Sequence, residues 1–113
     1  MLDVPLALAV IPAQATPALQ ARLPISAQIS VLQHGYAHTN FADTNARKIE
    51  LDDSRPAAYV IGELATGTQV LEHFAGFLPV LVPPWNRIAP HLIPFLPELG
   101  FCGLSTLGPR QRL

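Results

Sequence analysis

The sequence has little charge and no excess of either sign. Only 13% of the residues are charged, and 7 basic against 8 acidic residues leave a formal net charge of -1. Such a chain lacks the electrostatic attraction that draws proteins to nucleic acids or anionic membranes. No apolar stretch approaches the roughly 20 residues needed to span a bilayer. We therefore expect no nucleic acid and no membrane among its partners.

Cysteine is nearly absent too. A single cysteine, Cys102, excludes an internal disulfide and any zinc site built from several cysteines. The apolar N-terminus lacks the basic residues that open a signal peptide, because the first basic residue is Arg22. The sequence therefore predicts a cytoplasmic protein in which Cys102 is an inert core residue of a strand.

What the chain has in quantity is apolar side chains and proline. Half of the 113 residues are hydrophobic, which supplies the core of a single domain and excludes intrinsic disorder. The 12 prolines are scattered through apolar runs and form no repeat. Because they are scattered and not repeated, collagen-like proteins and extended proline-rich linkers are excluded.

Apolar runs of strand length alternate with helical segments in the order βαβαβαβ. Because every connection between strands contains a helix, this order predicts the parallel sheet of an α/β fold. The continuous apolar run of the first strand predicts that it is covered on both faces. The strands are expected at residues 4–11, 29–33, 79–82 and 101–106.

The expected helices carry recognisable ends. Thr16 precedes a proline and caps a short helix over residues 18–23, and Ser54 caps the next, long helix with Pro56 in its first turn. Two internal prolines predict that the segment 90–99 is kinked or split into short turns. Gly100 stands where a left-handed residue ends that segment.

A polar stretch separates the second strand from the long helix. Residues 35–54 have no periodicity of their own, and such long connections usually carry function. Its carboxylates Asp43, Asp52 and Asp53 are interpreted as caps and solvated charges.

The second strand runs directly into His34, and His38 follows four residues later. In a helical turn these side chains share one face, close enough for their imidazoles to hold one metal ion. The alternative is two unrelated surface or hydrogen-bonded histidines. Gly35 stands where helical metalloproteases carry the glutamate base, so a base would have to come from elsewhere. His73 and His91 are interpreted as structural and solvated histidines.

The third strand ends in a second polar group, residues 82–87. The pair of prolines fixes the backbone, so the N–H groups of Trp85 and Asn86 become rigid donors suited to a developing oxyanion. Arg87 has the donor geometry to hold a carboxylate through two hydrogen bonds. The alternative is a proline-stiffened turn whose tryptophan belongs to the core.

Residues 32–40, with their His-x-x-x-His spacing, resemble the second motif of the polysaccharide deacetylase (NodB-homology) family. Residues 82–87 are similar to its third motif, and residues 100–106 to a following strand, so the resemblance spans about residues 4–107. It implies a portion of a NodB-like (β/α) barrel that hydrolyses N-acetyl groups of a carbohydrate with a divalent metal, zinc by preference. His34 and His38 would bind the metal. Trp85 would give an N–H and an aromatic wall, and Arg87 would orient a carboxylate.

The chain also departs from the family pattern. The family's Asp-Asp motif, which supplies a base and the third metal ligand, has no counterpart, because Asp3 precedes the first strand. The family's later motifs would lie beyond Leu113, Arg87 follows the Pro-aromatic pair instead of preceding it, and Trp85 replaces a tyrosine. We therefore expect residues 1–113 to be a single, incomplete domain, inactive alone, whose exposed sheet edges favour self-association. Two alternatives stay open: a truncated or degenerate module that binds metal weakly or not at all, and an unrelated α/β binding domain.

Overall fold

The computed structural model describes residues 6–22, 29–106 and 111–112. The described elements are β1 (Leu6–Val10), η1 (Pro12–Gln14), α1 (Pro17–Arg22), β2 (Ile29–Gln33), α2 (Ala57–Leu71), β3 (Phe77–Leu81), η2 (Pro84–Asn86), η3 (Pro90–Phe95), η4 (Pro97–Leu99), β4 (Gly103–Leu104) and β5 (Gln111–Arg112). The η segments are single or paired turns of 3-10 helix.

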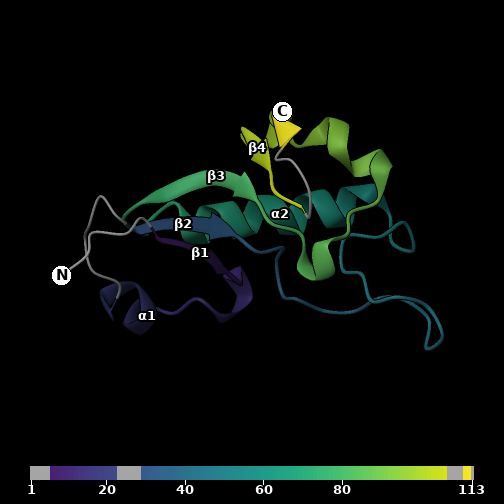
Figure 1. Cartoon of the computed structure of the whole chain (residues 1–113), viewed down its shortest axis with the longest axis horizontal. Coiled ribbons are helices and arrows are strands. Elements are labelled where there is room, and N and C mark those ends of the chain that lie inside the picture. The colour runs from purple at the N-terminus through teal and green to yellow at the C-terminus, as the bar shows by residue number, and fades with distance from the viewer. Residues whose placement is uncertain (1–5, 23–28, 107–110, 113) are drawn as a thin grey trace.

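The strands form one sheet in chain order, from β1 at one edge to β5 at the other. Strands β1 to β4 pair in parallel, which confirms the α/β class and the predicted order of four parallel strands. Helix α2 runs along the sheet (Figure 1). The short β5 pairs with β4 in the antiparallel sense and was not anticipated.

The first strand is less buried than its apolar sequence predicts. Leu6 is 51% exposed, and no residue of β1 is fully buried. The prediction of a strand covered on both faces is therefore wrong over residues 6–10, while residues 4 and 5 lie outside the described part. The reason is position, because β1 is an edge strand and only β2 pairs with it.

Capping residues and prolines in the sequence predicted some helix ends correctly and others incorrectly. The N–H of Leu19 donates to the Thr16 hydroxyl (3.0 Å), so the predicted cap of α1 is confirmed. Pro56 instead of Ser54 occupies the N-cap of α2 and makes no side-chain capping bond, so the Ser54 cap is wrong. The segment 90–99 is split into two 3-10 pieces and ends at Gly100 (φ 95°), both as predicted.

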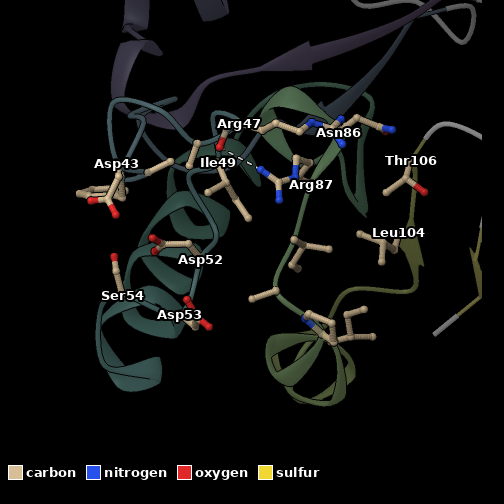
Figure 2. Close-up of a pocket in the computed structure, with 17 residues that line it drawn as sticks. Asp43, Arg47, Ile49, Asp52, Asp53, Ser54, Asn86, Arg87, Leu104 and Thr106 are labelled. Carbon is tan, nitrogen blue, oxygen red and sulfur yellow. Dashed lines mark hydrogen bonds between the residues drawn. The ribbon is translucent and has the colours of Figure 1, made fainter.

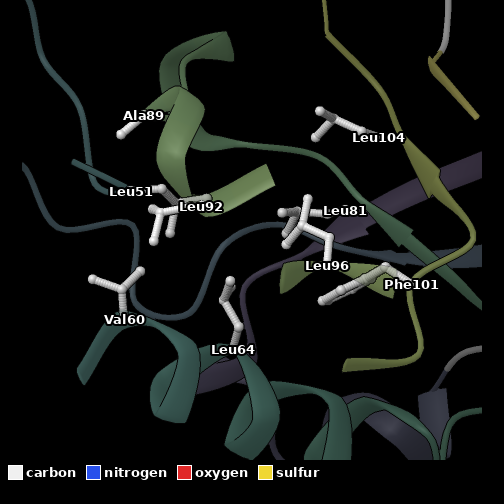
Figure 3. Close-up of a cluster of buried hydrophobic side chains, with 9 residues drawn as sticks. All are labelled: Leu51, Val60, Leu64, Leu81, Ala89, Leu92, Leu96, Phe101 and Leu104. Atoms are coloured by element: carbon white, nitrogen blue, oxygen red, sulfur yellow. The ribbon is translucent and has the colours of Figure 1, made fainter. Parts of the chain in front are cut away.

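The main core lies between α2, the ends of β3 and β4, and the 3-10 segments (Figure 3). Leu64 and Leu81 reach it from α2 and β3, and neither has measurable exposure. Leu51 joins them from the end of the polar connection. The complete cluster is Leu51, Val60, Leu64, Leu81, Ala89, Leu92, Leu96, Phe101 and Leu104. This core holds the polar stretch that ends at residue 54 and the segment after β3 against the carboxyl end of the sheet.

Two further findings concern solvent and membrane. Cys102 is exposed and precedes β4, so its interpretation as a core residue of a strand is wrong. The last strand is shorter than predicted because Gly100 and Phe101 still belong to the preceding turn, where their N–H groups donate to the carbonyls of Pro97 and Leu96. None of the helices in the described ranges is long and apolar enough to cross a membrane.

Candidate functional site

Two polar connections meet at the carboxyl edge of the parallel sheet. The N–H of Val82, after β3, donates to the carbonyl of Gln33 at the end of β2 (2.7 Å). The N–H of His34 donates to the carbonyl of Val10 at the end of β1 (2.9 Å). These bonds bring the segments after β1, β2 and β3 together at the edge where α/β proteins place their sites.

The histidine pair lies in a bent loop and not in a helical turn, so that detail of the prediction is wrong. Gly35 and His38 both have positive φ angles, 60° and 59°, which a helix does not allow. The bend nevertheless brings the two imidazole rings together, with centroids 4.9 Å apart. The bent loop therefore places the two imidazoles near each other, as a helical turn was expected to do.

His34 is fixed in one tautomer by its backbone partner. Its Nδ1 lies 2.8 Å from the carbonyl oxygen of Val82. A carbonyl only accepts, so Nδ1 carries the proton, and Nε2 of the neutral ring carries the lone pair. Metal-ligating histidines are commonly held in this way, with the second nitrogen bonded to a carbonyl.

Trp85 completes a group of three rings that we call the His–Trp cluster (His34, His38 and Trp85). The indole ring lies 4.2 Å from the His38 ring, centroid to centroid. Trp85 and Asn86 have φ angles of 53° and 60°, so together with His38 three non-glycine residues near this cluster are left-handed. Each such residue costs roughly 1–3 kcal/mol, and such strain is typical of functional sites.

The segment after Trp85 does not deliver all the predicted groups. Two N–H groups were predicted as oxyanion donors, those of Trp85 and Asn86. The N–H of Asn86 already donates to the Pro83 carbonyl (3.0 Å) and is therefore engaged. Arg87 donates from Nη1 to the carbonyl of Arg47 (2.9 Å), and not to a carboxylate. In the structure Arg87 therefore holds the polar loop through its backbone.

Glu50 is the residue of this region that the sequence reasoning missed. It is 1% exposed, and its carboxylate accepts the N–H groups of Ala37 (2.8 Å) and Tyr36 (3.3 Å). It therefore holds the loop that carries His38 in its bent form. The available signal was its position between the apolar Ile49 and Leu51, unusual for a solvated glutamate.

Asp52 also departs from its interpretation. Asp43 and Asp53 are exposed, as expected of loop charges, but Asp52 is only 6% exposed. Its Oδ1 has no hydrogen-bond partner within the described residues. The interpretation as a solvated charge is wrong for Asp52, because Leu51 beside it is drawn into the core and pairs with Ile88.

Gln33 joins the site to the long helix. Its buried amide donates to the carbonyls of Leu64 (3.0 Å) and Gly35 (3.2 Å), and accepts from the Thr68 hydroxyl (2.8 Å). Two of the three bonds, those with Leu64 and Thr68, join β2 to α2, and the third is local. The end of β2, and with it His34, is thereby fixed relative to α2.

Removing the Thr68 hydroxyl tests this connection. We expect Thr68→Val to lower the free energy of unfolding by about 1–3 kcal/mol, because the Gln33 oxygen then lacks its donor in a buried place. Chemical denaturation measures the change. Thr66→Val, on the exposed face of the same helix, is the matched control and should change stability by less than about 0.5 kcal/mol. Equal effects of the two variants would contradict the role given to Gln33.

The remaining predicted residues lie elsewhere, and the pair has no third ligand among the described residues. His91 is exposed, as interpreted, and His73, interpreted as structural, is exposed just after the end of α2. Within residues 6–22, 29–106 and 111–112, no three His, Cys, Asp or Glu side chains are grouped closely enough to hold a metal ion. Among these residues the structure therefore offers two imidazoles and an aromatic wall, with no carboxylate grouped with them as a third metal ligand.

Comparison of the chain with family models, with curated proteins and with solved structures found no match.

Proposed function

We propose that the His–Trp cluster is the metal- and acetamide-binding part of a polysaccharide deacetylase-type site, carried by a portion of a NodB-like barrel. The observation that carries the proposal is the 4.9 Å separation of the His34 and His38 rings, with Trp85 beside them, at the carboxyl edge of the sheet. The substrate would be an N-acetylated carbohydrate.

The two imidazoles are ligands of the type that zinc prefers, but they are fewer than a catalytic zinc site uses. Neutral imidazole nitrogens are preferred ligands of zinc, and the Val82 carbonyl leaves the His34 Nε2 lone pair for such use. A catalytic zinc site has three protein ligands, so two histidines alone should bind weakly. When bound, a divalent cation polarises a carbonyl and activates water.

The chain's own residues would bind and orient the substrate. Trp85 offers an indole face against the apolar face of a sugar ring. The backbone N–H of Trp85 remains a candidate donor to the acetamide oxygen. Arg87 keeps the polar loop in place through the Arg47 carbonyl. Because no third His, Cys, Asp or Glu ligand is grouped with the pair in the described part of the chain, we expect no turnover by this polypeptide alone.

A second candidate is a non-catalytic α/β module that binds metal weakly. The missing third ligand favours it, since no group of three His, Cys, Asp or Glu side chains includes the pair within the described ranges. The two candidates differ in what they expect of a sugar. A deacetylase-type groove binds an acetylated sugar beside the metal, whereas the module does not.

Cobalt(II) titration followed by visible absorption tests the metal part. We expect His34→Ala and His38→Ala each to weaken binding by more than about tenfold, because one of two ligands is lost. His91→Ala is the control, since His91 is exposed and lies outside the cluster. Binding that survives loss of both His34 and His38 would remove the basis of the proposal.

Sugar binding distinguishes the two candidates. Trp85 is the only tryptophan, so its fluorescence reports on the cluster directly. With cobalt present, we expect N,N′-diacetylchitobiose to change this fluorescence and its deacetylated counterpart to have less effect. A metal response without any sugar response supports the non-catalytic module instead. Acetate release that disappears in His34→Ala would show that a base is present in this chain, against our expectation.

A further inference from the structure

A cavity of about 800 Å³ lies between the polar loop and the segment that follows Trp85. It is lined by the polar loop on one side and by the segment 86–93, Leu104 and Thr106 on the other. Because Leu104 ends β4, the cavity also lies at the carboxyl edge of the sheet. Its volume is within the range of small-molecule sites.

One wall of this cavity is acidic. Asp43, Asp52, Asp53 and Ser54 line it. Arg47 and Arg87 also line the cavity, so three carboxylates face two guanidinium groups, and we call the cavity the acidic pocket. In Figure 2 the side chains of Asp43, Asp52 and Ser54 point toward the space between them. The other lining residues include the apolar side chains of Ile88, Ala89, Ile93 and Leu104, next to the polar Asn86, Arg87 and Thr106.

Asp52 is the residue that points to a ligand. It is only 6% exposed, and its Oδ1 is buried without a hydrogen-bond partner in the described part of the chain. Burying a carboxylate without a partner is unfavourable, so a site that keeps one gains from a ligand that supplies the missing donor and charge. The partner it lacks must be positively charged or a strong donor.

The arrangement favours an organic cation over a metal ion. Although three carboxylates line the pocket, no three acidic, histidine or cysteine side chains of the described residues are close enough together to hold a metal. A protonated primary amine has three N–H donors and no acceptor, which matches two carboxylates and a hydroxyl spread around a space. The apolar lining side chains would cover the body of the same molecule.

We propose that the acidic pocket binds a small molecule that carries a protonated primary amine on an apolar body. Asp52 takes the ammonium group, with Asp43 and Ser54 as further acceptors. Ile88, Ile93 and Leu104 contact the apolar part. The site is separate from the His–Trp cluster, since neither histidine nor Trp85 lines this pocket.

Calorimetric titration with phenethylamine tests the proposal, with 2-phenylethanol as the neutral probe of the same shape. We expect the amine to bind and the alcohol to bind at least about tenfold more weakly, because only the amine supplies a charged donor to the carboxylates. Equal binding of the two, or no binding of the amine at millimolar concentration, would overturn the proposal. Displacement of the amine by magnesium or calcium at equal concentration would assign the pocket to a metal instead.

The variant Asp52→Asn gives a signature of opposite signs. We expect it to weaken amine binding by about tenfold or more while raising the melting temperature of the free protein, because an unpartnered buried charge is removed. Glu98→Gln makes the same charge change at an exposed residue outside the pocket and should alter neither quantity. Asp43 is exposed, so Asp43→Asn should weaken amine binding without affecting the fold. Unchanged amine affinity in both aspartate variants would contradict the proposal.

Discussion

Replacing Glu50 with alanine is expected to lower the free energy of unfolding by about 3 kcal/mol or more and to abolish metal binding by the histidine pair. The carboxylate accepts the N–H groups of Tyr36 and Ala37, at 3.3 and 2.8 Å, in a place where Glu50 itself is 1% exposed. Each bond to a charged acceptor contributes about 1.5–3 kcal/mol, and alanine removes both. The loop that carries His38 then loses the group that holds its bend.

Two controls separate the hydrogen bonds from the charge. Glu50→Gln keeps one acceptor oxygen and the same shape, so we expect a smaller loss of stability and measurable cobalt binding. Glu72→Ala removes an exposed glutamate at the end of α2 and should cost less than about 0.5 kcal/mol. Denaturation curves and cobalt titration measure both quantities. If Glu50→Ala costs no more than Glu72→Ala, Glu50 does not hold the loop.

The alternation of apolar runs and helical segments was enough to predict the class and order of the sheet. Strand β2 lies at the predicted residues, because its apolar sequence is central in the sheet and both neighbours pair with it. Strand β1 is more apolar than β2, with no polar residue, but stands at the edge, where Leu6 is half exposed. A single apolar run does not distinguish a central strand from an edge strand, because the difference is made by partners far along the chain.

The candidate site was predictable where the chemistry was local and not where it was long-range. The proximity of His34 and His38 follows from four residues of spacing, although the loop between them is bent rather than helical. Glu50 and Asp52 stand on a polar stretch that offers no periodicity, and both are buried on either side of Leu51, which enters the core. Sequence patterns report which residues are charged, whereas the fold decides which charges are buried.

Replacing Gly35 with alanine should have an effect comparable to that of losing Glu50, by a different route. Gly35 has a φ of +60°, and an added Cβ would overlap Oε1 of Glu50 and lie 2.7 Å from Cγ of Pro84. Left-handed backbone costs an alanine roughly 1–2 kcal/mol, and overpacking a filled site costs about 1–3 kcal/mol more. Neither neighbour moves easily, since Pro84 is a buried ring and Glu50 is held by two N–H groups.

Gly62→Ala is the matched control because it should have the opposite sign. Gly62 lies within α2, and nothing stands within 4 Å of an added Cβ. Alanine there should stabilise the protein by about 0.5–1 kcal/mol, because it reduces the backbone entropy lost on folding. We therefore expect Gly35→Ala to lower and Gly62→Ala to raise the denaturation midpoint, with cobalt binding lost only in the former. A Gly35→Ala protein as stable as the wild type would show that the left-handed bend before His38 is not required by this fold.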